Sequence, residues 1–156
     1  MTVRHALVLA AVSLLVLAVA LRFRSDRPAS SVRADVVRTP GVLNSDVTQA
    51  TIRSTICVHG WTATVRPPVG YTNELKSEQM RAYRETGPAS GYQEDHLISL
   101  ELGGDPTDPR NLWPEPYPRA ADVDQIENEL NAEVCSGRLT LAEAQRKESE
   151  LKHNQG

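Results

Sequence analysis

Five prolines within residues 105–118 constrain the fold more than any other feature of the sequence: Pro106, Pro109, Pro114, Pro116 and Pro118. Proline has no backbone N–H and its φ is fixed, so it interrupts a helix and cannot complete the hydrogen bonds of a central strand. A helix and a central strand are therefore both excluded from residues 105–118. The other regular elements are expected on either side of it.

Two helices are predicted after the prolines. Apolar residues recur at steps of three and four, which predicts an amphipathic helix over about residues 120–135: Val123, Ile126, Leu130 and Val134. Gly137 follows where a left-handed residue commonly ends a helix. Thr140 and Glu143 have the spacing of a capping box, and this predicts a final helix over about residues 141–152.

Strands are predicted before the prolines. The apolar residues of segment 51–58 share one parity, as expected for a half-buried strand: Ile52, Ile56 and Val58. Residues 92–102 have the pattern of two short strands around a tight bend, after which Gly103-Gly104 turns the chain. Strands combined with helices in a chain of 156 residues indicate a single α+β domain.

The chemistry is concentrated between the predicted strands and the prolines. Asp95 and His96 are adjacent on a short apolar strand, and Asn111 stands fifteen residues after the histidine. Asp95 offers a hard oxygen ligand for a cation such as Mg²⁺ or Mn²⁺. His96 suits a general base, because its ordinary pKa lies near neutrality. Adjacent strand residues point to opposite faces, so both can serve one site only if the strand is twisted, is bulged or ends there.

This order of residues resembles the first two parts of an HNH-type endonuclease motif, over about residues 92–131. The resemblance is carried by Asp95-His96, Leu102-Gly103-Gly104 and Asn111-Leu112. It implies a ββα-metal fold, in which two antiparallel strands, a loop and a helix surround one divalent cation. It also implies that Asp95 is a metal ligand and that His96 is the general base. Asn111 would hydrogen-bond across the loop and hold the histidine strand in register.

The last metal ligand of that family, a His or Asn on the helix, has no clean match in this chain. Ala120 stands nine residues after Asn111, at the usual spacing. If the prolines push the helix later, its polar side offers four candidates: Asp124, Glu127, Asn128 and Asn131. We predict Asp124 as the ligand, with Asn128 one turn on as the second choice. The implied cofactor is Mg²⁺ or Mn²⁺, with Zn²⁺ as an alternative.

The wider pattern resembles a group of small exported bacterial proteins. The shared features are Gly60-Trp61, Arg66-Pro67-Pro68, the segments 95–98 and 111–116, and the two cysteines. In an exported domain, an even pair predicts one disulfide, Cys57–Cys135, which would close a loop of 77 residues. The alternatives are two buried thiols, or a zinc site built from Cys57, His59, Cys135 and His153, whose spacing matches no recognised zinc motif.

The N-terminus predicts where the domain is found. Residues 6–21 are apolar apart from Ser13. They are short for a membrane span of about 20 residues and long for the apolar core of a signal peptide. Residues 1–21 are therefore interpreted as a cleaved signal peptide or an uncleaved membrane anchor, with a buried helix as the third reading. The protein is expected to be extracytoplasmic, secreted or membrane-anchored, with a flexible linker at 22–49 and the HNH-like domain at 50–156.

The charge argues against a global nucleic-acid footprint. Beyond residue 20, 16 basic and 20 acidic residues remain, a net charge of −4. Residues 53–84 have a local excess of three positive charges, which is either one rim of a polyanion groove or ordinary surface charge.

The predicted fold is α+β, with a small ββα-metal (HNH-like) core, additional helices and one disulfide. The predicted function is metal-dependent phosphodiester hydrolysis by a monomer, with nucleic acid as the substrate. The alternative is a catalytically degenerate ββα-metal scaffold that acts as an extracytoplasmic binding module. A metallopeptidase is disfavoured, because no His-Glu-x-x-His pattern is present.

Overall fold

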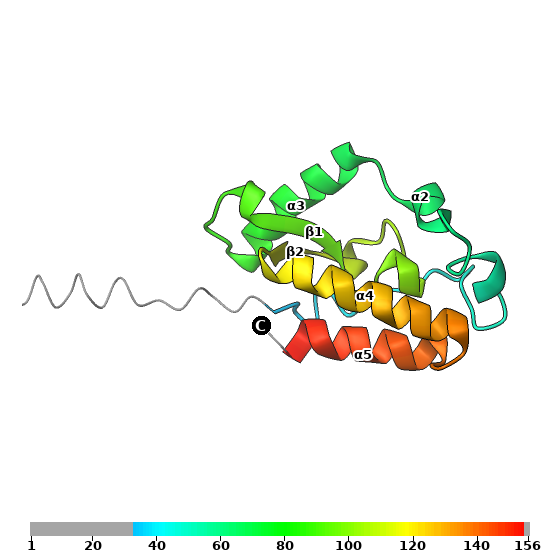
Figure 1. Cartoon of the computed structure of the whole chain (residues 1–156). Coiled ribbons are helices and arrows are strands. Elements are labelled where there is room, and N and C mark those ends of the chain that lie inside the picture. The colour runs from blue at the N-terminus through cyan, green and yellow to red at the C-terminus, as the bar shows by residue number, and fades with distance from the viewer. Residues whose placement is uncertain (1–32, 155–156) are drawn as a thin grey trace, which may run out of the picture. The chain divides into compact units, whose positions relative to one another are not determined.

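Two short antiparallel strands, β1 (Tyr92–His96) and β2 (Leu112–Pro116), lie between the helices (Figure 1). The structure is a computed structural model that describes residues 33–154. Asp95 is paired with Trp113, and His96 is paired with Leu112. β1 ends at His96, so the chain turns away directly after the two adjacent residues of the predicted site.

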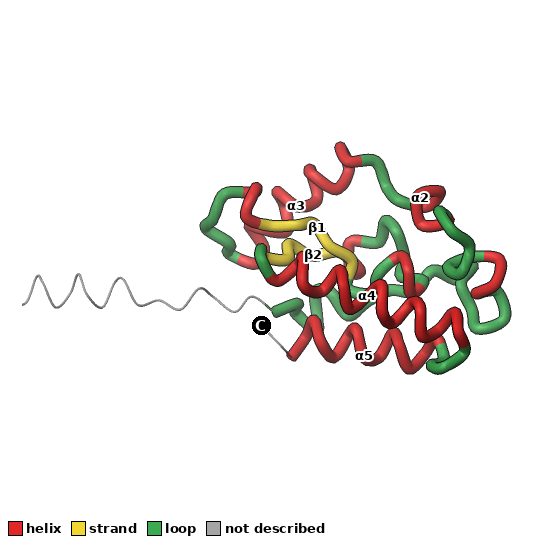
Figure 2. The backbone as a smooth tube through the Cα atoms, in the orientation of Figure 1, coloured by secondary structure: helices red, strands yellow, loops and turns green. Residues whose placement is uncertain are grey.

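Helices cover both faces of this small sheet (Figure 2). The described helices are α2 (Trp61–Val65), α3 (Val69–Tyr83), α4 (Arg119–Ser136) and α5 (Leu141–Asn154), with 3-10 turns η1 (Ile52–Ser54), η2 (Ala89–Gly91), η3 (Leu100–Leu102) and η4 (Pro109–Asn111). α3 packs on one side of the strands, α4 packs on the other, and α5 packs along α4. The protein is therefore an α+β protein, as predicted.

The last two helices form where the sequence predicts them. Gly137 ends α4 with a φ of 80°, in the left-handed region. The capping box begins α5: the Thr140 hydroxyl donates to Glu143 at 2.7 Å, and the Glu143 backbone N–H donates to that hydroxyl at 3.3 Å. Both signals depend on a few neighbouring residues, which is why they can be read without a tertiary structure.

The strand predictions are only partly correct. β1 is present, but its partner is β2 in the proline-rich segment and not a strand within residues 92–102. After β1, Leu97 enters one apolar cluster and Ile98 enters another, and η3 follows. The apolar run therefore serves the core. β2 tolerates Pro114 and Pro116 because it is an edge strand with a single partner.

The predicted strand at 51–58 is wrong. This segment contains η1 and a series of turns, stabilised by the Thr51 hydroxyl, which donates to the Asp46 carbonyl oxygen at 2.8 Å. Ile52 and Ile56 are buried, but Val58 is exposed. Residues four apart also share one side of a helical turn, so the parity of this segment did not distinguish a strand from turns.

Residues 33–49 are part of the folded domain and do not form the flexible linker that was predicted for 22–49. The backbone N–H of Ala34 donates to the Lys152 carbonyl oxygen at 3.2 Å, and Leu43 forms an isolated bridge with Gly104. Val47 is buried in the main apolar core. The domain therefore begins before residue 50, because these contacts place the segment against its C-terminal half.

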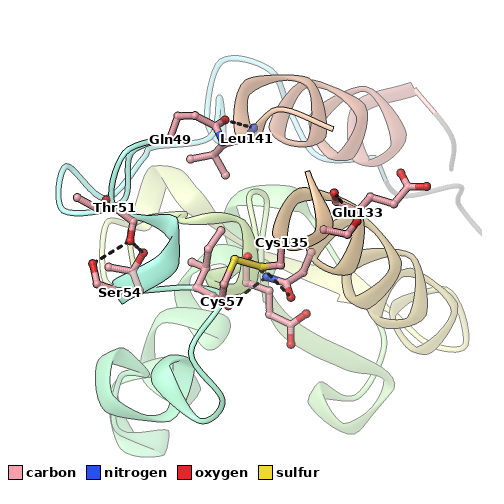
Figure 3. The surroundings of a disulfide bond; sticks show 12 residues. Gln49, Thr51, Ser54, Cys57, Glu133, Cys135 and Leu141 are labelled. Atoms are coloured by element: carbon pink, nitrogen blue, oxygen red, sulfur yellow. Dashed lines mark hydrogen bonds between the residues drawn. A yellow bond between two sulfur atoms is a disulfide. The ribbon is translucent and has the colours of Figure 1, made fainter. Parts of the chain in front are cut away.

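The disulfide lies at the C-terminal end of α4 (Figure 3), and its Cys57 packs against the main apolar core. The buried core residues are Val47, Ile52, Ile56, Ile98, Leu102, Leu130, Val134, Leu141 and Ala144. Cys57 and Cys135 form the predicted disulfide, with Cα atoms 5.5 Å apart. The bond ties the turns after η1 to the last turn of α4, and it excludes the alternative readings of buried thiols and of a zinc site built on these cysteines.

Residues 103–104 make the turn that the sequence indicates, and each position requires glycine for a different reason. Gly103 has a φ of 77°, which favours glycine. At Gly104 an added Cβ would lie 1.8 Å from the Ile98 carbonyl oxygen, so no larger residue fits. The turn therefore brings the chain into close contact with the residues that follow β1.

The predicted signal peptide or anchor at 1–21 lies outside the described residues. Within residues 33–154, no helix combines the length and the apolar character needed to cross a membrane.

Candidate functional site

Residues from several elements line one cavity of about 280 Å³. β1 contributes Gln93, Asp95 and His96, and the segment after it contributes Ser99, Leu100 and Glu101. α4 contributes Asp124, Glu127 and Asn128, and Arg66 comes from the segment between α2 and α3. The structure thus brings together Asp95, His96, Asp124 and Asn128, four of the five residues predicted for the site. Asp95 and His96 share the cavity although they are adjacent, because β1 ends at His96.

Three carboxylates face one another in this cavity. Oxygen atoms of Asp95, Asp124 and Glu127 lie within 4.8 Å of one another. The Gln93 side chain connects two of them, because its Nε2 donates to Asp124 Oδ1 at 3.2 Å and lies 3.4 Å from Asp95 Oδ1. Carboxylate oxygens are the donors that hard divalent cations prefer. These three residues could therefore hold such a cation.

A fully buried lysine on α5 lies behind these carboxylates. Lys152 Nζ donates to Asp95 Oδ2 at 2.7 Å and to Glu127 Oε1 at 2.6 Å. It also donates to the His96 carbonyl oxygen, and it lies 3.5 Å from Glu148 Oε1. One ammonium group therefore serves three acidic side chains from three elements.

The shared lysine separates the pKa values of the acidic groups. Burial alone would raise the pKa of Asp95, but the charge and hydrogen bond of Lys152, together with a hydrogen bond with Glu115, lower that pKa to about 2. Burial raises the pKa of Glu148 to about 7 and holds that of Glu127 well above its usual range. Burial would lower the pKa of Lys152, but its carboxylate neighbours keep it well above the usual value. The pair in which both groups are charged is therefore Asp95 and Lys152.

His96 is held as a neutral base. Its side chain is only 6% exposed, and its Nε2 lies 3.1 Å from the Pro106 carbonyl oxygen. A carbonyl oxygen only accepts, so Nε2 carries the proton and Nδ1 has the free lone pair. Burial lowers the pKa of His96 from its ordinary 6.5, which keeps the ring neutral near pH 7. Among the described residues, Nδ1 makes no hydrogen bond, so it is available to accept a proton.

Asn111 is not among the residues that line the cavity, and its side chain is fully buried. Its Nδ2 donates to the carbonyl oxygens of Ile98 and Asp105 at 3.0 and 2.9 Å. Its Oδ1 accepts from the backbone N–H of Ile98 at 3.0 Å. One side chain thus satisfies both backbone groups of Ile98, two residues after His96, and connects them to the turn that carries Pro106.

Some residues of this region were not identified from the sequence. Glu148 and Lys152 follow Leu141 and Ala144 at steps of three and four, so they continue the buried side of α5. Charged residues in such positions are unusual and were a readable signal. Glu115 is likewise fully buried beside Asp95, and its pKa is raised to about 8 by burial first and then by Asp95.

No known family model matches the chain, and neither curated proteins nor solved structures gave a match.

Proposed function

We propose that this domain is a metal-dependent phosphodiesterase of the ββα-metal type, with nucleic acid as its substrate. The observation that supports it best is a single cavity that contains three facing carboxylates and a neutral histidine with a free Nδ1. β1, β2 and α4 also follow one another in the order strand, strand, helix. The resemblance to the HNH-type motif supplies the reaction class.

The acidic side of the cavity fits a hard divalent cation, with Asp95, Asp124 and Glu127 as the ligands and Asn128 next to them. A bound Mg²⁺ or Mn²⁺ would stabilise negative charge on a phosphate group and on the leaving oxygen. Asp95 and Glu127 each have one oxygen in contact with Lys152, and the second oxygen of each faces away from that contact; Asp95 Oδ1 would bind a cation beside its 3.4 Å contact with Gln93 Nε2. All donors are oxygen atoms, so the hard cations are favoured over Zn²⁺.

The remaining roles belong to His96 and Arg66. His96 accepts a proton from the attacking water at Nδ1, while its Nε2–H stays bonded to the Pro106 carbonyl oxygen and fixes the ring. Arg66 lines the same cavity and forms no salt bridge within residues 33–154. Its guanidinium group is therefore available to bind the phosphate oxygens of the substrate.

The compartment is part of the same proposal. The disulfide supports an oxidising environment, in keeping with an exported protein that is secreted or membrane-anchored. Nucleic acid outside the cytoplasm is then the substrate.

The test is cleavage of plasmid DNA and of RNA by the full-length protein with its disulfide intact. We expect cleavage with Mg²⁺ or Mn²⁺, none with EDTA, and a loss of roughly 10²–10⁴-fold in His96→Ala, because the general base is removed. The matched control is His59→Ala, which removes an exposed histidine outside this cavity. If the folded wild-type protein cleaves neither polymer with any divalent cation, the proposal fails.

Two observations favour the second candidate, a binding module that has lost catalysis. Lys152 already compensates Asp95 and Glu127, and His96 is almost completely buried. Calorimetry with Mn²⁺ separates the candidates. Micromolar binding that disappears in Asp95→Ala supports the enzyme, whereas a wild-type protein without measurable binding supports the module.

A further inference from the structure

Lys152 has the surroundings of a bound metal ion. Its Nζ is enclosed by oxygen atoms from Asp95, Glu127, Glu148 and the His96 backbone, and its side chain has no exposed surface. These oxygens come from β1, α4 and α5, so residues far apart in sequence share one ammonium group. Neither a surface lysine nor a lysine in an apolar core is enclosed by oxygen atoms in this way.

We propose that Lys152 is a built-in counter-ion, which holds the carboxylates of the cavity in place and lets the domain fold without a bound metal. In this role Lys152 holds Asp95 and Glu127, two of the residues that would bind the metal in the proposed function. The inference rests on that proposed function. It is a positioning residue, because it reaches the cavity only through the two carboxylates.

The division of oxygen atoms supports this role. Asp95 uses Oδ2 for Lys152, while its Oδ1 lies near Gln93 Nε2, which also donates to Asp124. Glu127 uses Oε1 for Lys152. The ammonium group thus fixes the back of both carboxylates and leaves one oxygen of each for another cation.

The balance of buried charge supports it as well. Asp95, Glu127 and Glu148 lie around Lys152, while the nearby Glu115 forms a salt bridge with Arg119. Within the described residues, Glu148 Oε2 is buried and has no hydrogen-bond partner. Without Lys152, three acidic groups would therefore be left with no positive charge among them. Such a cluster needs either protons or another cation.

The experiment is thermal unfolding of the full-length Lys152→Met variant in EDTA and in saturating Mn²⁺. Methionine keeps most of the length of the side chain and removes its charge. In EDTA we expect the melting temperature to fall by roughly 10 °C or more. Mn²⁺ should raise it by at least about twice the rise seen in the wild-type protein, since the cation then replaces the lost charge. If the variant is unfolded in EDTA, the measurement becomes refolding on addition of Mn²⁺.

Two further variants keep the result decisive. Lys147→Met makes the same change at an exposed position of α5 and should behave like the wild-type protein. Adding Glu148→Gln to Lys152→Met should recover part of the stability in EDTA, because it removes one buried acidic group that would otherwise need a proton or a cation. Equal losses with and without Mn²⁺, with no recovery by Glu148→Gln, would mean that Lys152 only fills space and would overturn the inference. Failure to refold at any Mn²⁺ concentration would overturn it as well.

These outcomes are separate from the test of the enzyme. A wild-type protein that cleaves no nucleic acid removes the proposed reaction, but Lys152→Met can still acquire Mn²⁺-dependent stability. Conversely, an active wild-type enzyme whose Lys152→Met variant shows no greater Mn²⁺ response removes the counter-ion and leaves the reaction in place.

Discussion

Glu94 and Asp95 are neighbours on β1, but on the two sides of the strand the pKa values of their carboxyl groups shift in opposite directions. Asp95 points toward α4 and α5, where Lys152 binds it, and its pKa falls to about 2. Both oxygens of Glu94 are buried and have no hydrogen-bond partner in the described chain. Burial raises the pKa of Glu94 to about 8, although Lys76 opposes this.

The difference shows that burial does not decide the charge of a side chain by itself. Lys76 is a cation near Glu94, but its Nζ donates to the carbonyl oxygens of Ala89 and Tyr92 at 3.2 and 3.1 Å. Lys152 instead lies 2.7 Å from Asp95. Lys152, together with a hydrogen bond with Glu115, outweighs burial at Asp95, whereas Lys76 does not outweigh it at Glu94. Asp95 is therefore the one of these two neighbours that keeps its charge near neutral pH. That side is also the one that lines the cavity.

The largest expected effect comes from removing the charged partner. Asp95→Ala leaves Lys152 with fewer anions around it, so the free energy of unfolding should fall by up to about 5 kcal/mol. Chemical denaturation measures this, and Asp122→Ala, at an exposed position of α4, is the control that should change little. An Asp95→Ala loss below about 1 kcal/mol would mean that the contact with Lys152 does not stabilise the fold.

Opening the disulfide should have a comparable but slightly smaller effect. Cys57 and Cys135 are 78 positions apart, so the loop-entropy model gives a loss of about 4 kcal/mol for the Cys57→Ser/Cys135→Ser variant. The bond holds the end of α4, which covers the Asp95 side of β1, so that side should loosen first. Hydrogen exchange should show greater opening in α4 than in α3. Equal opening of both helices would contradict this. As a control, the free energy of unfolding of the wild-type protein, measured in the presence of reductant, should match that of the variant.

Asn111 holds the backbone of Ile98, two residues beyond the end of β1. Asn111→Ala leaves the buried N–H and carbonyl oxygen of Ile98 without this partner, so we expect a loss of about 3 kcal/mol in unfolding free energy. His96 should also lose its fixed orientation, which its NMR signals would report. Asn128→Ala, on the exposed side of α4, should stay within about 0.5 kcal/mol of the wild-type protein.

The last prediction concerns the uncompensated side of the strand and appears as a pH dependence. The pKa of Glu94 is about 8 in the fold against an ordinary 4.5, so the folded state binds the extra proton between these values. Its contribution to stability is complete below pH 4.5 and is lost as the pH rises through about 8. Glu94→Gln cannot ionise, so its melting temperature should fall less than that of the wild-type protein between pH 5 and about 8. If the melting temperatures of the two proteins fall in parallel over this pH range, ionisation of Glu94 does not destabilise the fold.

Local sequence signals were sufficient for the second half of the fold. The apolar spacing of α4, the glycine after it and the Thr140–Glu143 capping box are each contained within a few residues, and all are present as predicted. The segment 51–58 and the partner of β1 were not predictable in the same way. An apolar residue marks burial, but it does not say whether a strand, a turn or a neighbouring core buries it.

The sequence by itself determined the α+β class and the last two helices, because these depend on short-range spacing, and it predicted the disulfide between Cys57 and Cys135 from an even pair of cysteines. It also singled out Asp95, His96 and Asp124, which the fold brings to one cavity. Only the tertiary structure decided that residues 33–49 belong to the domain and that Lys152 lies behind Asp95. The reason is distance along the chain: 57 positions separate those two residues, and the contact exists only when α5 packs beside β1 and α4.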